Sequence, residues 1–600
     1  SDVYKRQTLA DIEHRVDQLL RQGHLQKGKG VDRNLVTTRD AIGLEQRIIA
    51  AVETGRGHGT AVVAADVAGE RLQALSQLKY GLTLNPGQEW AGRLLLASHN
   101  RIVAIQGVAG AGKSTVLKPV ADILREEGRS VLGLAVQNTL VQMLERDTSI
   151  PSMTVARFLR QHRDLVEGAD QARLAEARAS LRGTTVLLDE ASMVGNADKE
   201  KLVRLANLLQ LDRFASIGDR KQLGAVDAGK PFDVMQKAGV ETATMNTNLR
   251  ARDKALRDAQ YAAQGGHIDE ALRHLGPHIV ASGDTATVDA AAAWLSLSPA
   301  EREVTAIYAS GRNLRGQVND AVQTGLKANG ELGPGSLRLN VLSRINLTRE
   351  EMRYARSYAA GMVLEVDRRQ RGQGLQKGRY EVVETDPTRE RVMLQNERGK
   401  RFEFRPGQMR PQGEQDPLRL FEVRPLEIHD GDRIRWTATD HKRGLLNADQ
   451  ARIVAVDGKG VTVKTSLGAE HRLGLGDPML ERLDLAYALN AHMAQGLTSD
   501  RGIAVMDSRE RNLANQQTFL VTITRLRDGL TLFVDNAGKL EAAVERNPGM
   551  KRSALETVNQ LRDAAAMGQA KGKASDRSQE PAREPPELDR SITKPFEIGI

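Results

Sequence analysis

Short apolar runs alternate with amphipathic stretches between residues 81 and about 240 of this chain. The runs occupy residues 102–105, 131–134, 186–188 and 214–217. Such alternation is typical of a parallel sheet covered by crossover helices. The pattern therefore predicts an α/β unit, with a second α/β segment that begins near residue 304 and resumes at residues 502–506.

A different pattern fills residues 350 to 475. Strand candidates at residues 363–366, 380–383, 392–394, 433–436 and 461–463 are separated by Gly, Pro and Asp. Short runs bounded by turn residues predict strands, so we expect small β-rich insertions here. We expect Trp436 to belong to a core rather than to a binding surface.

The two ends of the chain differ from its middle. Residues 8 to about 80 place Leu9, Ile12, Val16 and Leu19 along one face, which predicts helices. The tail from about residue 568 is rich in Pro, Glu, Arg and Ser, so we expect it to be disordered. The first residues resemble neither a signal peptide nor a Met start, which favours a fragment.

The composition restricts the possible classes of protein but does not indicate a function. The 600 residues exceed one core, so we expect several domains of about 100–200 residues each. The net charge of +9 permits a polyanionic partner without requiring one. The absence of cysteine excludes disulfides and thiolate metal sites and favours a cytoplasmic location. Since no apolar run approaches roughly 18–20 residues, we expect no membrane insertion.

A phosphate-binding pattern follows the first apolar run. Gly107, four residues, and then Gly112, Lys113 and Ser114 precede a predicted helix, with Gly110 inside the loop. Glycines let backbone N–H groups point at a phosphate, and the helix N-terminus favours negative charge. Lys113 and Thr115 would contact ATP, and Ser114 would ligate Mg²⁺. A Gly-rich turn without a ligand is the alternative, which the Lys-Ser pair disfavours.

Asp189 and Glu190 directly follow the apolar run at residues 186–188. We expect Asp189 to hold Mg²⁺ and Glu190 to orient the attacking water. An acidic pair after a strand is also a common helix N-cap. Its position downstream of the phosphate-binding loop favours the catalytic interpretation.

Four further segments resemble motifs of superfamily 1 helicases. Residues 218–226, with Gln222, resemble motif III, and residues 247–250, with Arg250, resemble motif IV. Residues 488–498 resemble motif V, and residues 521–527, with Arg525, resemble motif VI. The resemblance implies that Gln222 senses the γ-phosphate and that Arg250 and Arg525 stabilise its transition state. Any one of these arginines taken singly would be read as a surface residue.

Flanking segments narrow the resemblance to RecD-like helicases of superfamily 1B and to the helicase region of TraI/TrwC-type conjugative relaxases. Residues 84–88 resemble the Q-motif, in which Gln88 would read the adenine. Residues 36–39 with Leu44 and Glu45, and residues 346–348 with Glu351, Tyr358 and Gly361, resemble the relaxase helicase regions. The resemblance covers most of residues 35–540.

The resemblance implies an α/β fold with two RecA-like P-loop motor domains, β-rich SH3-like insertions and an N-terminal helical subdomain. The expected boundaries are 1–80 for the helical subdomain, 81–245 for motor domain 1, 246–350 and 481–540 for the two parts of motor domain 2, 351–480 for the insertions, and 541–600 for a helical and then disordered tail.

The resemblance also implies contacts with single-stranded and forked DNA. The candidate DNA-binding residues are Asn138, Thr154, Phe158, His492 and Thr498. Phe158 could stack on a base, although a Phe at such a place is more often part of the core. A basic loop with Arg368, Arg369, Arg371, Lys377 and Arg379 could clamp the strand or simply be solvated.

Two departures from the family are visible. Met493 stands where motif V often carries Lys, which puts one DNA or nucleotide contact in doubt. No His-x-His occurs among the 12 histidines, so we expect no relaxase nicking site in this chain.

The resemblance therefore implies an ATP-dependent 5′–3′ DNA helicase that forms the helicase part of a conjugative relaxase. Relaxosome and type IV secretion coupling proteins are its expected partners. A RecD-like repair helicase and a hydrolysis-inactive single-stranded DNA-binding module are the alternatives. Lys113, Asp189, Glu190, Gln222 and Arg525 argue against the inactive module.

Overall fold

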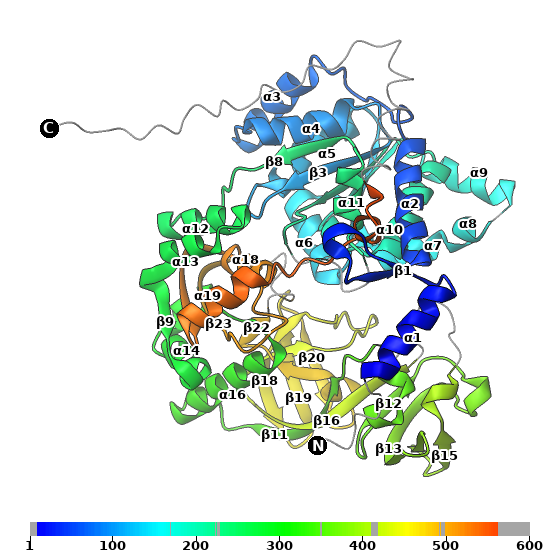
Figure 1. Cartoon of the computed structure of the whole chain (residues 1–600). Helices are drawn as coiled ribbons and strands as arrows, with labels where there is room; N and C mark the ends of the chain where they lie inside the picture. Colours follow the sequence, from blue (N-terminus) through cyan, green and yellow to red (C-terminus); the bar gives the residue numbers. More distant parts are fainter. Residues whose placement is uncertain are drawn as a thin grey trace.

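Two parallel sheets form the body of the computed structural model, and two antiparallel sheets are attached to it (Figure 1). The structure describes residues 9–168, 170–222, 224, 229–348, 351–409, 418–490, 493 and 498–561. The expected disordered tail from residue 568 lies outside these residues.

The first parallel sheet has the strand order β5-β4-β6-β7-β3-β8. Its strands are β3 (Ile102–Gly107), β4 (Ser130–Ala135), β5 (Ser152–Thr154), β6 (Thr184–Leu188), β7 (Arg213–Gly218) and β8 (Thr242–Met245). The four apolar runs predicted as strands in this region are confirmed as β3, β4, β6 and β7. The sheet is buried on both sides, which explains why these strands read as continuous apolar runs.

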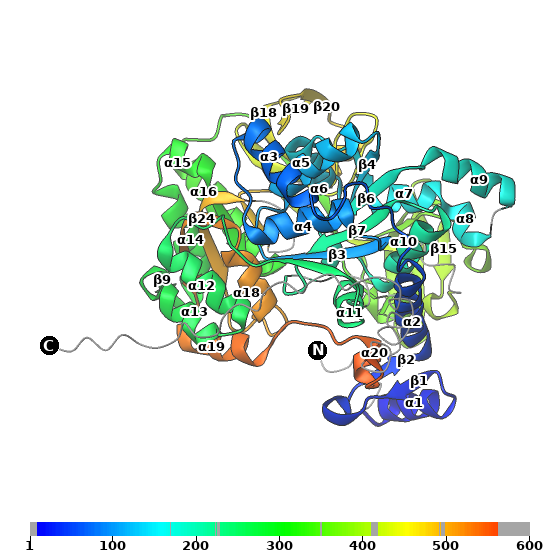
Figure 2. The ribbon, with the colours of Figure 1, turned by 90° about the horizontal axis from the view of Figure 1, so that it is seen from above.

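Helices cover both faces of this sheet (Figure 2). One face packs against α3 (Ala68–Tyr80), α4 (Pro86–Ala97) and α5 (Lys113–Glu126). The other packs against α2 (Arg39–Thr54), α10 (Asn196–Leu208) and α11 (Pro231–Lys237). Neighbouring β3 positions serve opposite faces, since Val103 joins the first cluster and Ala104 the second.

The second parallel sheet has the order β22-β10-β23-β24-β9. Its strands are β9 (Ile279–Ala281), β10 (Thr305–Ala309), β22 (Ala488–Asn490), β23 (Ser499–Met506) and β24 (Leu526–Val534). The helices around it are α12 (Lys254–Gly265), α13 (Ile268–Leu275), α14 (Ala286–Leu295), α16 (Arg312–Ala328), α18 (Gln516–Ile523) and α19 (Ala537–Arg546). The predicted second α/β segment is therefore confirmed, and its strands come from both sides of the β-rich insertions.

The insertions form two antiparallel sheets. The first contains β11 (Ser336–Arg344), β12 (Val363–Val366), β13 (Gly378–Asp386), β14 (Arg391–Asn396), β15 (Arg401–Phe404) and β16 (Leu418–His429). The second contains β17 (Arg433–Trp436), β18 (Gln450–Asp457), β19 (Gly460–Thr465), β20 (Glu470–Gly474) and β21 (Leu483–Leu485). The antiparallel part begins at Ser336 rather than at residue 351, because β11 pairs with β16 along nine positions.

The second antiparallel sheet shares a core with the second parallel sheet. Trp436 is fully buried, as predicted, and belongs to one apolar cluster with Trp294 of α14, Val318 of α16 and Val505 of β23. Because these side chains pack together, β17–β21 and the second parallel sheet form one body.

The sequence predicted an N-terminal region made of helices, and this prediction is only partly correct. Between α1 (Leu9–Arg21) and α2, strands β1 (Leu25–Lys27) and β2 (Val36–Thr38) form an antiparallel pair. Gly23 and Gly30 have positive φ, which breaks the helical path, and the β-branched residues of β2 favour a strand. Within the described part of the chain, no helix is long and apolar enough to cross a membrane.

Candidate nucleotide and nucleic-acid site

The phosphate-binding loop joins β3 to α5. Gly107 ends β3 and Lys113 begins α5, while Gly110 and Gly112 have φ of +77° and +73°. A Cβ at Gly110 would lie 2.5 Å from Asn248 Oδ1, so the loop needs glycine for space as well as for conformation. Lys113 Nζ donates to the Gly107 carbonyl at 3.3 Å, which folds the lysine back across the loop.

Gln88 supports this loop from α4. Asn85 and Gln88 form a capping box at the start of α4. The Gln88 amide Nε2 also donates to the carbonyls of Ala111 and Gly112, both at 3.3 Å. Gln88 is therefore buried beneath the phosphate-binding loop, and its adenine-reading role stays a prediction.

The acidic pair lies at the carboxyl end of β6. Burial and the neighbouring Glu190 raise the pKa of Asp189 to about 6, and Lys113 opposes this shift. Glu190 has φ +47°, and its buried Oε2 has no hydrogen-bond partner among the described residues. Left-handed backbone and an unpaired buried oxygen are both costly, which is typical of a site that acts on a ligand.

The donors near this pair fit a magnesium ion. The Ser114 hydroxyl and the Asp189 carboxylate line the same cavity, and both offer the hard oxygen ligands that Mg²⁺ takes. Within the residues described, no cluster of three His, Cys, Asp or Glu side chains could hold a metal alone. Such a site suits Mg²⁺, because this ion is commonly held by one or two carboxylates together with substrate phosphates.

Four polar side chains lie at the boundary between the two parallel sheets. Arg525 donates to Gln222 Oε1 at 2.9 Å, and Gln222 Nε2 donates to Asp219 Oδ2 at 3.2 Å. Arg250 donates to the Thr524 carbonyl at 2.7 Å. Burial and the charge of Arg525 lower the pKa of Arg250 to about 9, so a bound anion would be favoured here.

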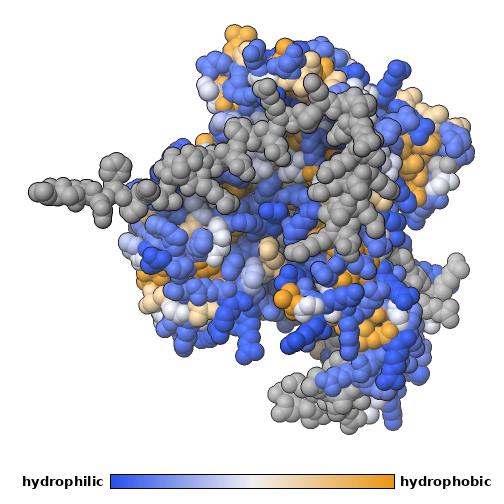
Figure 3. Space-filling model, turned by 45° about the horizontal axis from the view of Figure 1, so that its top comes forward, coloured by the Kyte–Doolittle hydropathy of each residue, from blue (hydrophilic) through white to orange (hydrophobic). Residues whose placement is uncertain are grey.

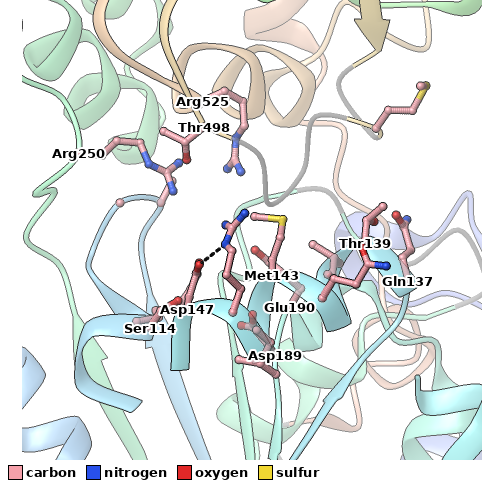
Figure 4. A pocket seen from close by; sticks show the side chains of 18 of the residues that line it. Ser114, Gln137, Thr139, Met143, Asp147, Asp189, Glu190, Arg250, Thr498 and Arg525 are labelled. Carbon is pink, nitrogen blue, oxygen red and sulfur yellow. Dashed lines mark hydrogen bonds and ion pairs between the residues drawn. The ribbon is translucent and has the colours of Figure 1, made fainter. Parts of the chain in front are cut away.

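One cavity of about 1070 Å³ joins these groups. In Figure 4, Arg250, Arg525 and Thr498 lie on one side, with Ser114, Asp189 and Glu190 on the other. The predicted site residues that line it are Gly110, Gly112, Lys113, Ser114, Thr115, Asp189, Glu190, Gln222, Arg250, Thr498 and Arg525. Gln88, Gly107, Asn138, Thr154 and Phe158 do not line it. His492 lies outside the described residues.

Further residues line the cavity beside the candidate site residues above. Gln137 and Thr139 flank Asn138 at the start of α6 (Asn138–Thr148). From the other side, Asp449 and Leu467 reach the cavity from turns of the second antiparallel sheet. Burial raises the pKa of Asp449 to about 6. No signal in the sequence indicated these turns, because the 80% exposure of the apolar Leu467 side chain is visible only in the structure.

Two of the DNA-binding candidates have structural roles in this conformation. Phe158 is 2% exposed and packs in the core beneath the first sheet, with its ring 4.7 Å from that of His162. The base-stacking interpretation of Phe158 is therefore wrong for this conformation. The Thr154 hydroxyl accepts from Arg157 N and so caps α7 (Val155–Gln161).

The proposed basic clamp is partly neutralised. Arg379, one of its members, forms an ion pair with Glu481. Arg368 also has an interaction partner. These contacts favour a structural role for at least part of this loop.

Comparison with known families identifies two domains. Residues 83–280 match the AAA domain, and residues 341–428 match the DNA relaxase TraI 2B/2B-like domain. The first match contains the phosphate-binding loop and Arg250. The second covers most of the first antiparallel sheet.

Several curated proteins are similar in sequence. The multifunctional conjugation protein TraI of Escherichia coli (strain K12) is 24% identical over 504 residues, which cover 76% of this chain and 27% of TraI. Conjugal transfer protein TraA of Rhizobium radiobacter is 26% identical over 198 residues, 32% of this chain and 16% of TraA. The ATP-dependent RecD2 DNA helicase of Deinococcus radiodurans is 34% identical over 143 residues, 24% of this chain and 19% of RecD2.

Among solved structures, Bacteroides Pif1 bound to ssDNA has a TM-score of 0.45 and 13% identity, covering 82% of this chain and 98% of that one. The chain spans only about a quarter of the length of TraI. By its motifs and by the sequence matches, the chain resembles the superfamily 1B helicase region of the TraI conjugation proteins.

Proposed function

We propose that this chain is an ATP-driven 5′–3′ translocase and helicase on single-stranded DNA, and that it serves as the helicase part of a conjugative relaxase. One observation carries the proposal. Lys113, Asp189 and Glu190 of the first parallel-sheet unit line one cavity with Arg250, at the connection between the units, and Arg525 of the second. A nucleotide held between two units can drive their relative motion.

In this proposal each parallel-sheet unit is a RecA-like motor domain, and the antiparallel sheets are the SH3-like insertions. Lys113 and Thr115 bind the phosphates, and Ser114 and Asp189 would hold Mg²⁺, which would supply positive charge to neutralise the phosphates. Glu190 orients the attacking water with its unpaired Oε2. Arg250 and Arg525 stabilise the charge that develops on the transferred phosphoryl group.

The conjugative context draws on the TraI and TraA relatives and on the TraI 2B/2B-like domain. Relaxosome and coupling proteins are its proposed partners, and the cytoplasm is its proposed location. On the face in Figure 3, hydrophilic residues predominate and apolar ones form small separate groups. The likeness to the RecD2 DNA helicase, whose name indicates no role in conjugation, supports the rival assignment, a repair helicase.

ATP hydrolysis with and without single-stranded DNA tests the proposal. We expect strong stimulation by DNA in the wild-type chain and its loss in Lys113→Ala and Glu190→Gln. Lys118→Ala is the matched control, because Lys118 lies on the same helix but stacks on the Tyr80 ring. DNA binding without any hydrolysis by the wild-type chain would favour the inactive binding module. Unwinding of forked substrates with opposite tails then gives the polarity.

A further inference from the structure

The chain crosses from the second parallel-sheet unit back to the first after α19. The Asn547 carbonyl accepts from Gln516 N at 2.9 Å, and the Asn547 amide donates to the Arg511 carbonyl at 3.0 Å. Gly549 lies against Asn515, where a Cβ would meet Asn515 Oδ1 at 2.5 Å. The chain is therefore held by the second unit as far as Gly549.

Three residues later the first unit holds it. Arg552 forms an ion pair with Asp32 at 3.3 Å, and α20 (Ala554–Thr557) begins directly afterwards. The fully buried Glu45 of α2 accepts from Ala554 N at 3.0 Å and from Leu555 N at 2.8 Å. Glu45 thus satisfies backbone donors at the start of α20, as a capping side chain would.

Apolar and charged contacts add to this anchor. Leu555 is fully buried in a cluster with Ile42 and Ile49 of α2 and Val234 of α11. Glu556 pairs with Lys230 at 2.7 Å and with Lys237, and its pKa is lowered to about 2 despite burial. The cluster and the ion pairs together make α20 a docked element of the first unit.

The anchor is connected to the residues that directly precede α11. Asn196 donates to Glu45 Oε1 at 3.1 Å, and Gly229 lies so close to Asn196 that a Cβ would meet its side chain at 2.1 Å. Lys230 then pairs with Glu556. The residues that hold α20 therefore border Gly229 and Lys230, which directly precede α11.

The crossing is short enough to act as a tether. Three residue steps span at most about 11 Å when fully extended. Within the described chain, the other crossing between the units is the connection from β8 to α12, where Leu249 N donates to the Gly110 carbonyl at 2.9 Å. Figures 1 and 2 place α20 and this connection on different parts of the boundary. A body tethered at two separate points can rotate about the line through them but cannot separate freely.

We infer that α20 and residues 550–552 form a strap that, together with the β8–α12 connection, makes a two-point hinge and confines closure of the cavity to one rotation. The inference rests on the proposed motor function, because such a hinge would couple nucleotide binding to DNA engagement. With either crossing alone, only one covalent connection would join the units, and closure could then follow more than one axis.

Lengthening the strap tests the hinge without disturbing either anchor. Ten Gly and Ser residues inserted between Met550 and Lys551 leave α19 and α20 intact, and Met550 is 51% exposed. Because the chain has no cysteine, Gln46→Cys and Lys539→Cys give a clean labelling pair on the two units. Single-molecule energy transfer then reports the distribution of distances between the units.

We expect a narrow distribution of distances between the two labels in the wild-type chain and an at least twofold broader distribution after the insertion. DNA stimulation of ATP hydrolysis should fall at least threefold, while hydrolysis without DNA changes less than twofold. An unchanged distance distribution in the lengthened chain would overturn the hinge. The distance measurement needs no hydrolysis, so an inactive wild-type chain would sink the proposed function and leave the hinge testable.

A variant that detaches α20 from the first unit provides a second test of the hinge. Leu555→Asp should release α20 and broaden the distribution to the same extent, whereas Leu78→Asp, at a 90% exposed leucine, should not. Thermal unfolding of both variants checks that the two units remain folded. A folded Leu555→Asp variant with a wild-type distribution would also contradict the inference.

Discussion

Gln222 and Arg525 are 303 residues apart in sequence, and a 2.9 Å hydrogen bond between their buried side chains joins the two parallel-sheet units. Gln222 belongs to the first unit and also contacts Asp219. Arg525 follows α18 of the second. In this conformation Gln222 therefore holds the arginine that we expect to reach the γ-phosphate.

This bond predicts strongly non-additive effects of substitution. Arg525→Ala should lower the rate of ATP hydrolysis roughly 10³-fold, as expected for an arginine that stabilises the transferred phosphoryl group. Gln222→Ala should lower it less, and the double variant should resemble Arg525→Ala, because Gln222 acts through Arg525. Single-turnover hydrolysis measures all three. Losses that multiply in the double variant would show that the residues act independently.

Gly110→Ala should weaken nucleotide binding strongly while the protein remains folded. A residue with a side chain at φ +77° costs about 1–2 kcal/mol, and here the new Cβ would also displace Asn248 Oδ1, which accepts from Arg250 N. Gly128→Ala is the matched control, because it has φ +68° and open space around its Cβ. Titration with a fluorescent nucleotide should find an at least tenfold loss only in Gly110→Ala. Equal affinities in the two variants would contradict the steric argument.

The sequence predicted the parts of this molecule that local signals encode. The strands that precede Gly107 and Asp189 could be located because buried parallel strands are continuous apolar runs, and each is followed at once by its motif. The first residue of the antiparallel part could not be located from the sequence, because the pairing of β11 with β16 joins segments about 80 residues apart. The contribution of Asp449 and Leu467 to the cavity could not be predicted either, since it depends on how the units pack.

The role of Phe158 also depends on tertiary packing and could not be decided from the sequence. An aromatic residue after a strand can stack on a base or fill a core, and only its burial distinguishes the two. Phe158→Ala should destabilise the fold by about 3–5 kcal/mol, because its ring is 2% exposed in a packed cluster. Trp90→Ala, at a 38% exposed ring, should cost much less.

Urea unfolding measures these costs, and fluorescence anisotropy on the folded variants measures affinity for single-stranded DNA. We expect that affinity to change less than twofold in Phe158→Ala. A tenfold loss in the folded protein would restore the stacking interpretation.

Lys199 predicts how stability depends on pH. Its side chain is fully buried in α10, where Nζ donates to Ser216 Oγ at 3.0 Å, and burial lowers its pKa from 10.5 to about 7. Between these pH values the unfolded chain binds the proton more tightly, so this lysine makes the free energy of unfolding rise with pH. Each unit of pKa difference corresponds to about 1.4 kcal/mol.

Lys199→Met removes this dependence, because methionine fills a similar volume without a charge. We expect the variant to be more stable than the wild type at pH 7, with the difference shrinking as pH approaches 10, where the wild-type lysine is neutral in the folded state. Urea unfolding at several pH values measures it, and Lys201→Met on the same helix, whose side chain is 23% exposed, is the control. A stability difference that stays constant with pH would mean that Lys199 keeps its charge inside the fold, which would require a negative partner that Ser216 does not supply.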